Sequence, residues 1–174
     1  MILSTASKNN RHKIKDLNEL ANIIGGLKNS GSKIVHCHGV FDLLHIGHNR
    51  HFEQALEMGD VLIVTLTEDQ HVNKGPGRPA FAQDLRAEAI SAFDCVDFVA
   101  INRWPQATEA IKLLRPDFYV KGSDYQDASN DNTGGIVLEE AAAQSVNGQL
   151  VFTDNIVFSS TNLLNRHIVN SLLK

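Results

Sequence analysis

The sequence contains the segment Gly39-Val40-Phe41-Asp42-Leu43-Leu44-His45-Ile46-Gly47-His48, which joins two stretches of different periodicity. The apolar run over 33–38 before it is typical of a buried strand, and the amphipathic run over 49–58 after it is typical of a helix. A helix N-terminus that follows a glycine-flanked turn offers free backbone N–H groups and the positive end of the helix dipole. We therefore expect an anion-binding site at this turn.

The composition is that of an ordinary globular domain. The 174 residues are 43% hydrophobic and 21% charged, so one domain with a normal core is expected. The formal net charge of -4 argues against a general nucleic-acid-binding surface. Cys37 and Cys95 are far apart in the sequence and lack the spacing of a metal site, so reduced thiols are predicted in place of a disulfide.

No membrane or export signal is found in the sequence. No apolar run approaches the roughly 18 residues that a membrane-spanning helix needs, and the N-terminus lacks the apolar core of a signal peptide. We therefore expect a cytoplasmic protein that does not associate with membranes.

Apolar runs and helical periodicities alternate along the chain. Strands are expected over 33–38, 61–66, 96–101, 118–120 and 150–152. Helices are expected from Asp16, which can cap the first, and over 49–58, 84–93, 107–114, 136–146 and 159–172. This alternation predicts an α/β fold with a mainly parallel five-stranded sheet and helices on both faces. Residues 1–30 are expected to form a lead-in and a helix before the main domain, residues 31–174.

Ligands of such sheets bind beyond the carboxyl ends of the strands. The histidine motif follows the first expected strand, and a glycine- and proline-rich loop over 73–79 follows the second. Residues 121–125 follow the fourth strand, and residues 159–161 lie beyond the fifth. We therefore expect these four segments to meet at one edge.

The two motif histidines carry the clearest chemistry. His45 and His48 can each present a ring N–H to a phosphate oxygen, and a bound phosphate favours the cationic ring by raising its pKa. Gly47 allows a phosphate to approach the backbone. Together with the helix N-terminus these groups would stabilise charge that develops at phosphorus. The structural alternative is that the histidines cap the helix or fill the core.

The remaining candidates each have a plain structural alternative. Lys74 and Arg78 can clamp phosphates or be solvated loop charges, and Arg86 can reach an anionic substrate or form a surface ion pair. Gly122 and Tyr125 can contact a base or belong to a polar turn. The hydroxyls of residues 159–161 can bind phosphate or cap a helix. His36 and His38 flank Cys37, but neighbours on a strand face opposite sides, so a zinc site is not expected.

The histidine motif resembles the His-x-Gly-His signature of cytidylyltransferase-like nucleotidyltransferases. The segments Lys74–Pro79, Leu85–Glu88, Arg115–Asp117 and Lys121–Tyr125 follow it in order. That series is similar to the nucleotidyltransferase domain of bifunctional ADP-heptose synthases, which make precursors of the lipopolysaccharide core, and it spans about residues 33–165. The resemblance implies a Rossmann-like three-layer α/β/α sandwich.

The resemblance also implies roles for particular residues. The expected catalytic residues are His45, His48 and Lys74. Nucleotide contacts are expected from Gly39, Val40, Phe41, Asp42, Gly47, Lys121, Gly122, Asp124, Tyr125, Ser159, Ser160 and Thr161. Contacts to the second substrate are expected from Arg78 and Arg86. Mg²⁺ is expected to arrive with the nucleoside triphosphate (NTP).

The expected reaction is transfer of a nucleotidyl group from an NTP to a phosphorylated acceptor, with release of pyrophosphate. ATP and a sugar 1-phosphate are favoured, because the stretch from Asp154 to Ile156 departs from the arginine and glutamate of glycerol-phosphate cytidylyltransferases. CTP with an acceptor such as glycerol 3-phosphate is the alternative, and a non-catalytic nucleotide sensor is a third. A class I aminoacyl-tRNA synthetase is disfavoured, because no Lys-Met-Ser-Lys-Ser segment occurs. A homodimer and an upstream sugar kinase stay open as partners.

Overall fold

The computed structural model describes residues 10–126 and 135–154. The five strands are β1 (Ile34–Gly39), β2 (Val61–Thr67), β3 (Phe98–Asn102), β4 (Phe118–Gly122) and β5 (Gln149–Thr153). The five α-helices are α1 (Leu17–Asn29), α2 (Ile46–Leu56), α3 (Gln83–Ser91), α4 (Thr108–Leu114) and α5 (Gly135–Ser145). Short 3-10 turns, η1 (Asn10–Lys13), η2 (Asp69–His71) and η3 (Ser123–Tyr125), complete the described part. The helix expected over 159–172 lies outside these residues.

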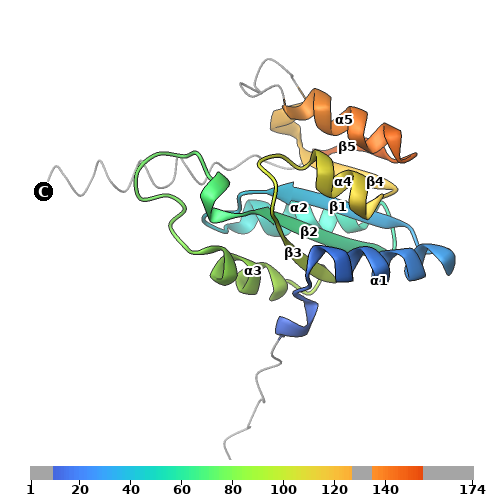
Figure 1. Ribbon diagram of the computed structural model, residues 1–174, viewed down its shortest axis with the longest axis horizontal. Coiled ribbons are helices and arrows are strands. Elements are labelled where there is room, and N and C mark those ends of the chain that lie inside the picture. Colours follow the sequence, from blue (N-terminus) through green and yellow to red (C-terminus); the bar gives the residue numbers. More distant parts are fainter. Residues whose placement is uncertain (1–9, 127–134, 155–174) are drawn as a thin grey trace, which may run out of the picture.

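The strands form one sheet in the order β3-β2-β1-β4-β5, and every pair is parallel (Figure 1). The predicted parallel α/β architecture is thus confirmed. In the ladder His38 lies opposite Thr65 of β2, and Cys37 lies opposite Val120 of β4. Because β1 is central, the turn that follows it lies at the middle of the carboxyl edge.

Helices cover both faces of the sheet, as predicted. On one face, α2 and α3 contribute Phe52, Ala55 and Ile90 to a core with alternate strand residues such as Val35. On the other face, α1 packs through Leu17, Leu20 and Ile24 against Ile34 and Ile63. Helices α4 and α5 complete that second layer around Tyr119. The two-residue period of β1 divides its side chains between these layers.

The amino edge of the sheet is held by aspartates. Asp97 accepts a hydrogen bond from the Leu62 amide at 2.8 Å, and Asp117 accepts one from the Ile34 amide at 2.9 Å. At the start of α1, Asp16 accepts from the amide of Asn18 at 2.7 Å, which confirms the expected cap. Polar side chains therefore satisfy the strand starts, whereas the carboxyl edge stays open for a pocket.

Helix α2 begins earlier than the sequence pattern predicts. It starts at Ile46, with extended backbone at His45 as the N-cap, whereas the amphipathic run alone placed the start near residue 49. The two motif histidines therefore occupy the N-cap and the third position of the helix. Among the described residues, no helix is both long enough and apolar enough to cross a membrane.

Candidate functional site

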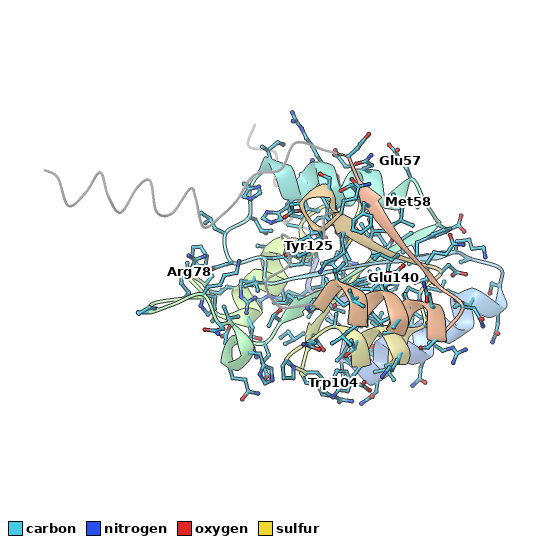
Figure 2. All side chains as sticks on the ribbon, turned by 90° about the horizontal axis from the view of Figure 1, so that it is seen from above. Glu57, Met58, Arg78, Trp104, Tyr125 and Glu140 are labelled. Atoms are coloured by element: carbon cyan, nitrogen blue, oxygen red, sulfur yellow. The ribbon has the colours of Figure 1, made fainter. Side chains whose placement is uncertain are left out.

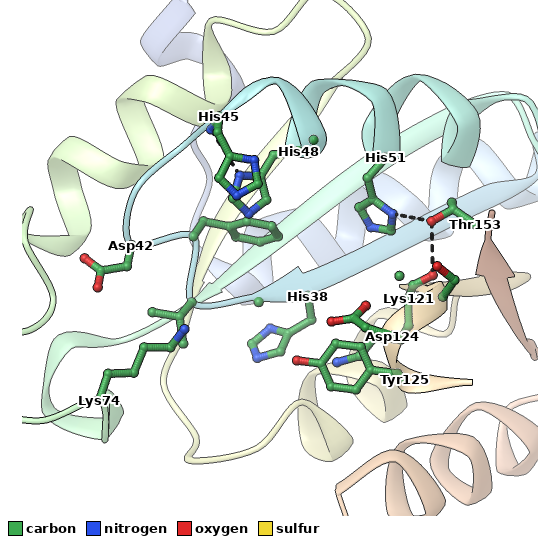
Figure 3. Close-up of a pocket in the computed structure, with 16 residues that line it drawn as sticks. His38, Asp42, His45, His48, His51, Lys74, Lys121, Asp124, Tyr125 and Thr153 are labelled. Carbon is green, nitrogen blue, oxygen red and sulfur yellow. Dashed lines mark hydrogen bonds between the residues drawn. The ribbon is translucent and has the colours of Figure 1, made fainter. Parts of the chain in front are cut away.

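A pocket lies at the carboxyl edge of the sheet, where β1, β4 and β5 end (Figure 3). Its lining combines the turn after β1, the first turns of α2, the loop after β2 and the segment after β4. The lining residues are His38, Gly39, Val40, Phe41, Asp42, His45, Gly47, His48, His51, Lys74, Lys121, Gly122, Ser123, Asp124, Tyr125 and Thr153. Of the fourteen predicted site residues that the structure describes, twelve therefore meet in one place.

The motif histidines form a stacked pair. The ring centroids of His45 and His48 are 3.9 Å apart with an interplanar angle of 24° (Figure 3). The ring of Phe41 meets His48 edge-on at 5.4 Å. The His45 backbone N–H donates to Nδ1 of His48 at 3.2 Å. Because Nδ1 accepts, a neutral His48 ring carries its proton on Nε2. The pair thus caps the helix and still offers an N–H donor.

The His48 ring is neutral near pH 7 in this structure. Burial, followed by the neighbouring charges of His45, His51 and Lys74, lowers its pKa to about 3. The cationic ring expected from the sequence depends on a bound phosphate, which would oppose these effects. Before an anion binds, the site therefore presents a neutral donor.

The conformation of the turn after β1 requires a glycine at position 39. Phe41 adopts a positive φ of 50°, which is uncommon for a residue with a side chain. Its ring lies beneath Gly39, where a Cβ atom would stand 3.0 Å from the Phe41 Cζ atom. A side chain at position 39 would push this ring out of place. Gly39 thus allows Phe41 to support His48 from below.

Asp42 and Arg78 hold the loop over 73–79 against the pocket. The Asp42 carboxylate is buried, and it accepts hydrogen bonds from Nε of Arg78 and from the Ala80 amide. Arg78 is not among the lining residues, so the structure ties it to Asp42 and not to open pocket space. Lys74 of the same loop does line the pocket. Burial and the Arg78 charge lower the pKa of Lys74, and the Asp42 charge partly opposes them.

Arg86 has a structural role that the sequence reasoning did not foresee. The side chain is buried, and it donates to the backbone carbonyls of Phe81, Val40 and Thr67 and to the Asp69 carboxylate. It pairs with neither Asp84 nor Glu88, and it does not line the pocket. Its guanidinium crosses from α3 to the ends of β1 and β2, so it braces the turn that carries the histidines.

Lys121 is held in a buried ion pair. Its ammonium lies 3.1 Å from Oε2 of Glu139 on α5, and both side chains are 9% exposed. It also stands over the ring of Tyr125 at 4.5 Å. The next residue, Glu140, is exposed on α5 (Figure 2), whereas Glu139 is buried. The pair fixes the end of β4 below the pocket.

Four lining residues were not among the predicted site residues: His38, His51, Ser123 and Thr153. His51 had a signal, because it repeats the three-residue spacing of His45 and His48 along one helix. His38 shares the Thr65 hydroxyl with His36, at 2.8 and 2.7 Å. In the part of the chain that the structure describes, no three metal-ligating side chains cluster. Ser159, Ser160 and Thr161 lie outside the described residues.

Comparison with known proteins gives a consistent picture. The cytidylyltransferase-like family model matches residues 36–166. A bifunctional protein HldE of Aliarcobacter butzleri is 42% identical over 136 residues, which cover 77% of this chain and 28% of that protein. The HldE of Geobacter sulfurreducens is 39% identical over 115 residues, 65% of this chain and 24% of that protein. The chain thus spans about a quarter of the length of these relatives.

Two crystal structures share the fold. The lipopolysaccharide core biosynthesis protein from Thermoplasma volcanium has a TM-score of 0.61 and 21% identity, and the match covers 73% of this chain and 100% of that one. The pantoate-beta-alanine ligase of Francisella tularensis has a TM-score of 0.62 and 16% identity, covering 91% and 76%. At these identities the likeness shows the Rossmann-like architecture alone.

Proposed function

This chain belongs to the cytidylyltransferase-like family, and on that premise we propose that it is a nucleotidyltransferase that moves a nucleotidyl group from an NTP to a phosphorylated acceptor. One observation carries the proposal. His45 and His48 stack at the N-terminus of α2 and line a single pocket with Lys74 and the end of β4. An anion at this point would meet backbone N–H groups, the helix dipole and a cation.

The proposed reaction is an in-line displacement at the α-phosphorus. A phosphate oxygen of the acceptor forms the new P–O bond, and pyrophosphate leaves with the electrons of the old one. The Nε2–H of His48 and the first amides of α2 are aimed at where charge develops, and Lys74 neutralises the triphosphate. Such fixed donors stabilise a transition state without reorganisation, so positioning and charge stabilisation supply the catalysis.

We propose ATP and a sugar 1-phosphate as the substrates, as in ADP-heptose-type nucleotide-sugar synthesis. The HldE relatives at 39–42% identity support this choice. Because these relatives are bifunctional and much longer, the proposal includes a sugar kinase activity, on this or another chain, that supplies the acceptor. CTP with glycerol 3-phosphate is the competing pair, since the family model is named for cytidylyl transfer.

Mg²⁺ belongs to the proposal as an ion that the NTP carries. The pocket residues fit this form of delivery, because Mg²⁺ is commonly held by one or two carboxylates together with substrate phosphates. Asp124 lines the pocket, while the Asp42 carboxylate is bound to Arg78. When bound, the ion would neutralise charge on the departing pyrophosphate.

Pyrophosphate release tests the proposal. The chain is incubated with Mg²⁺, each of ATP, CTP, GTP and UTP, and either a panel of sugar 1-phosphates or glycerol 3-phosphate. We expect release above background only when an NTP and its acceptor are both present, with ATP and a sugar 1-phosphate fastest. Preference for CTP and glycerol 3-phosphate would select the competing pair. Tight nucleotide binding with no release for any pair would contradict the enzyme and favour a sensor.

A further inference from the structure

His51 is a pocket residue to which the proposed reaction gives no role. It lies on α2 one helical turn after His48 and six residues after His45, so the three imidazoles follow each other along one side of the helix (Figure 3). Its ring lines the pocket between the motif histidines and Thr153 of β5. Three histidines at this spacing place three ring edges along one wall.

Two hydrogen bonds point to one tautomer of His51. Its Nδ1 is 2.9 Å from the Thr153 hydroxyl oxygen, and that hydroxyl donates to the Lys121 carbonyl at 3.4 Å (Figure 3). A threonine hydroxyl has one proton, and the carbonyl can only accept. With the proton directed to Lys121, the His51 ring must donate from Nδ1. Its Nε2 then carries a lone pair.

This lone pair is available to a ligand. Within residues 10–126 and 135–154, Nε2 of His51 has no hydrogen-bond partner, and it is not sealed from solvent. Burial of the ring and the nearby Lys121 charge lower the pKa of His51 to about 4, so the imidazole is neutral near pH 7. The ring therefore presents an uncharged acceptor to the pocket.

His48 and His51 are consequently complementary. A backbone N–H binds Nδ1 of His48, which leaves Nε2–H as a donor suited to phosphate oxygens. A hydroxyl binds Nδ1 of His51 and leaves Nε2 as an acceptor, which repels a phosphate oxygen and attracts an N–H or O–H group. The boundary between phosphate and non-phosphate parts of a ligand thus falls between two adjacent turns of α2, about 5 Å apart along the helix axis.

We propose that His51 is a specificity-determining residue that accepts a hydrogen bond from the nucleoside half of the NTP, and that Thr153 is the positioning residue that holds its tautomer. This inference rests on the proposed function. It assigns the nucleoside because His51 faces the end of the pocket formed by residues 121–125, where the Tyr125 ring offers a surface for stacking. The donor is a ribose hydroxyl or the exocyclic amino group that adenine and cytosine share.

A matched pair of variants tests the acceptor. In His51→Gln the side-chain amide reaches the place of Nε2, whereas in His51→Asn it reaches only the place of Nδ1. We expect His51→Asn to raise KM for the preferred NTP about tenfold with little change in kcat, and His51→Gln to recover most of the affinity. Glu57→Gln, at the exposed end of α2, serves as the control. Equal KM values for wild type and His51→Asn overturn the proposal.

Nucleotide analogues identify the donor. Wild type and His51→Asn are compared with the 2′-deoxy and 3′-deoxy forms of the preferred NTP and with an analogue that lacks the exocyclic amino group. The analogue that lacks the donor should raise KM about tenfold for wild type and leave KM of His51→Asn unchanged. That analogue identifies the group that donates to His51. If each of the three analogues raises KM equally for both proteins, His51 accepts no hydrogen bond from the nucleoside and the proposal is wrong.

Nuclear magnetic resonance can test the tautomer of His51 independently of whether the protein catalyses the proposed reaction. In protein with ¹⁵N-labelled histidine at pH 7, Nε2 of His51 should show the shift of an unprotonated ring nitrogen, and His51→Gln assigns the signal. Thr153→Val should lose this tautomer and raise KM, and Thr153→Ser should restore both. A protonated Nε2 overturns the inference even in an active enzyme. Failure of the wild type to release pyrophosphate would contradict the proposed function and leave the tautomer measurable.

Discussion

At the scale of single residues, the two ring nitrogens of His48 have separate tasks. Nδ1 accepts from the His45 amide and completes the helix cap, and Nε2 faces the pocket. A substitution can separate these tasks, because an asparagine oxygen reaches the place of Nδ1 but nothing replaces Nε2. The cap and the proposed catalytic role therefore use different nitrogens of this ring.

We predict that His48→Asn lowers kcat for pyrophosphate release by about 100-fold or more, which is the usual effect of removing one transition-state donor. The free energy of unfolding should stay within about 0.5 kcal/mol of wild type, because the cap is kept. Steady-state kinetics and urea denaturation measure the two effects. His71→Asn, whose ring contacts the Arg103 carbonyl outside the pocket, should keep its rate. A near-normal rate for His48→Asn would remove this ring from the mechanism.

Arg86 gives a stability prediction. Arg86→Met removes the donor for three backbone carbonyls and leaves Asp69 without its buried cation, so we expect a loss of about 3 kcal/mol or more in the free energy of unfolding. Lys112→Met, which breaks an exposed pair with Glu109, should change it by less than about 1 kcal/mol. Chemical denaturation of both variants checks the contrast. Similar losses would show that Arg86 does not brace the turn.

Sequence reasoning found the histidines but not the partners of the arginines. The spacing of His45, Gly47 and His48 is local, so it can be read from the chain. The contacts of Arg86 reach carbonyls 5, 19 and 46 residues away, and no periodicity encodes which loop closes on which side chain. The tautomer of His51 depends on a hydroxyl 102 residues distant, so the helical spacing can indicate the residue but not its role as an acceptor.

At the scale of elements, the ion pair between Lys121 and Glu139 joins α5 to β4. Glu139→Gln should destabilise the fold by about 3 to 5 kcal/mol, because it leaves the Lys121 charge buried without a partner. The double variant Lys121→Met/Glu139→Leu should recover much of this loss, since it removes both charges. Glu140→Gln on the exposed side of α5 is the control. Thermal and urea unfolding would contradict the pairing if the single and double variants were equally stable.

A second prediction at this scale concerns how the ion pair of Asp42 and Arg78 restrains the loop over 73–79. Asp42→Asn removes the charge that holds Arg78, so we expect the loop to open more often and trypsin to cut after Lys74 several times faster. Limited proteolysis followed by mass spectrometry locates the cut. Asp84→Asn, an exposed change at the start of α3, should leave the rate unchanged. Equal cleavage rates in the Asp42 variant and wild type would show that the ion pair does not restrain the loop.

Element positions were more predictable than their ends. All ten α-helices and strands expected within the described residues occur, because apolar runs and helical periodicity survive in the final packing. The predicted start of α2 was about three residues too late. Ile46 and Gly47 carry no amphipathic signal, and the helix begins there because His45 is its N-cap. The ion pair of Glu139 could not be predicted from helical periodicity, because its partner Lys121 lies on β4, a separate element.

At the scale of the whole molecule, the buried His36 and the half-buried His38, His48 and His51 make stability depend on pH. Burial is the main cause that lowers the pKa of His36 and His48 to about 3 and of His51 to about 4, and it lowers that of His38 well below its usual range. Below pH 6.5 these histidines bind protons in the unfolded chain but stay neutral in the folded chain. The free energy of unfolding therefore falls as pH drops from 6.5 toward 4, and it is unaffected by these groups above 7.

We predict that unfolding in urea requires several kcal/mol less free energy at pH 5.0 than at pH 7.5, because each such histidine contributes about 1.4 kcal/mol per pH unit. The carboxyl of Asp117, whose pKa is also lowered, adds to the loss only below its ordinary value of 3.8. A denaturation series between pH 7.5 and 5.0 measures the slope. A flat series would mean that the four rings are protonated in the folded protein.

The central position of β1 has a consequence for synthesis on the ribosome. Its ladder with β2 joins segments that emerge soon after one another, whereas its other neighbour, β4, emerges about 80 residues later. Until then the nascent chain has one open edge on its middle strand, with unpaired amides and carbonyls. Among the pocket residues that the structure describes, Thr153 is the last to emerge. The motif histidines are therefore synthesised well before the substrate pocket is complete.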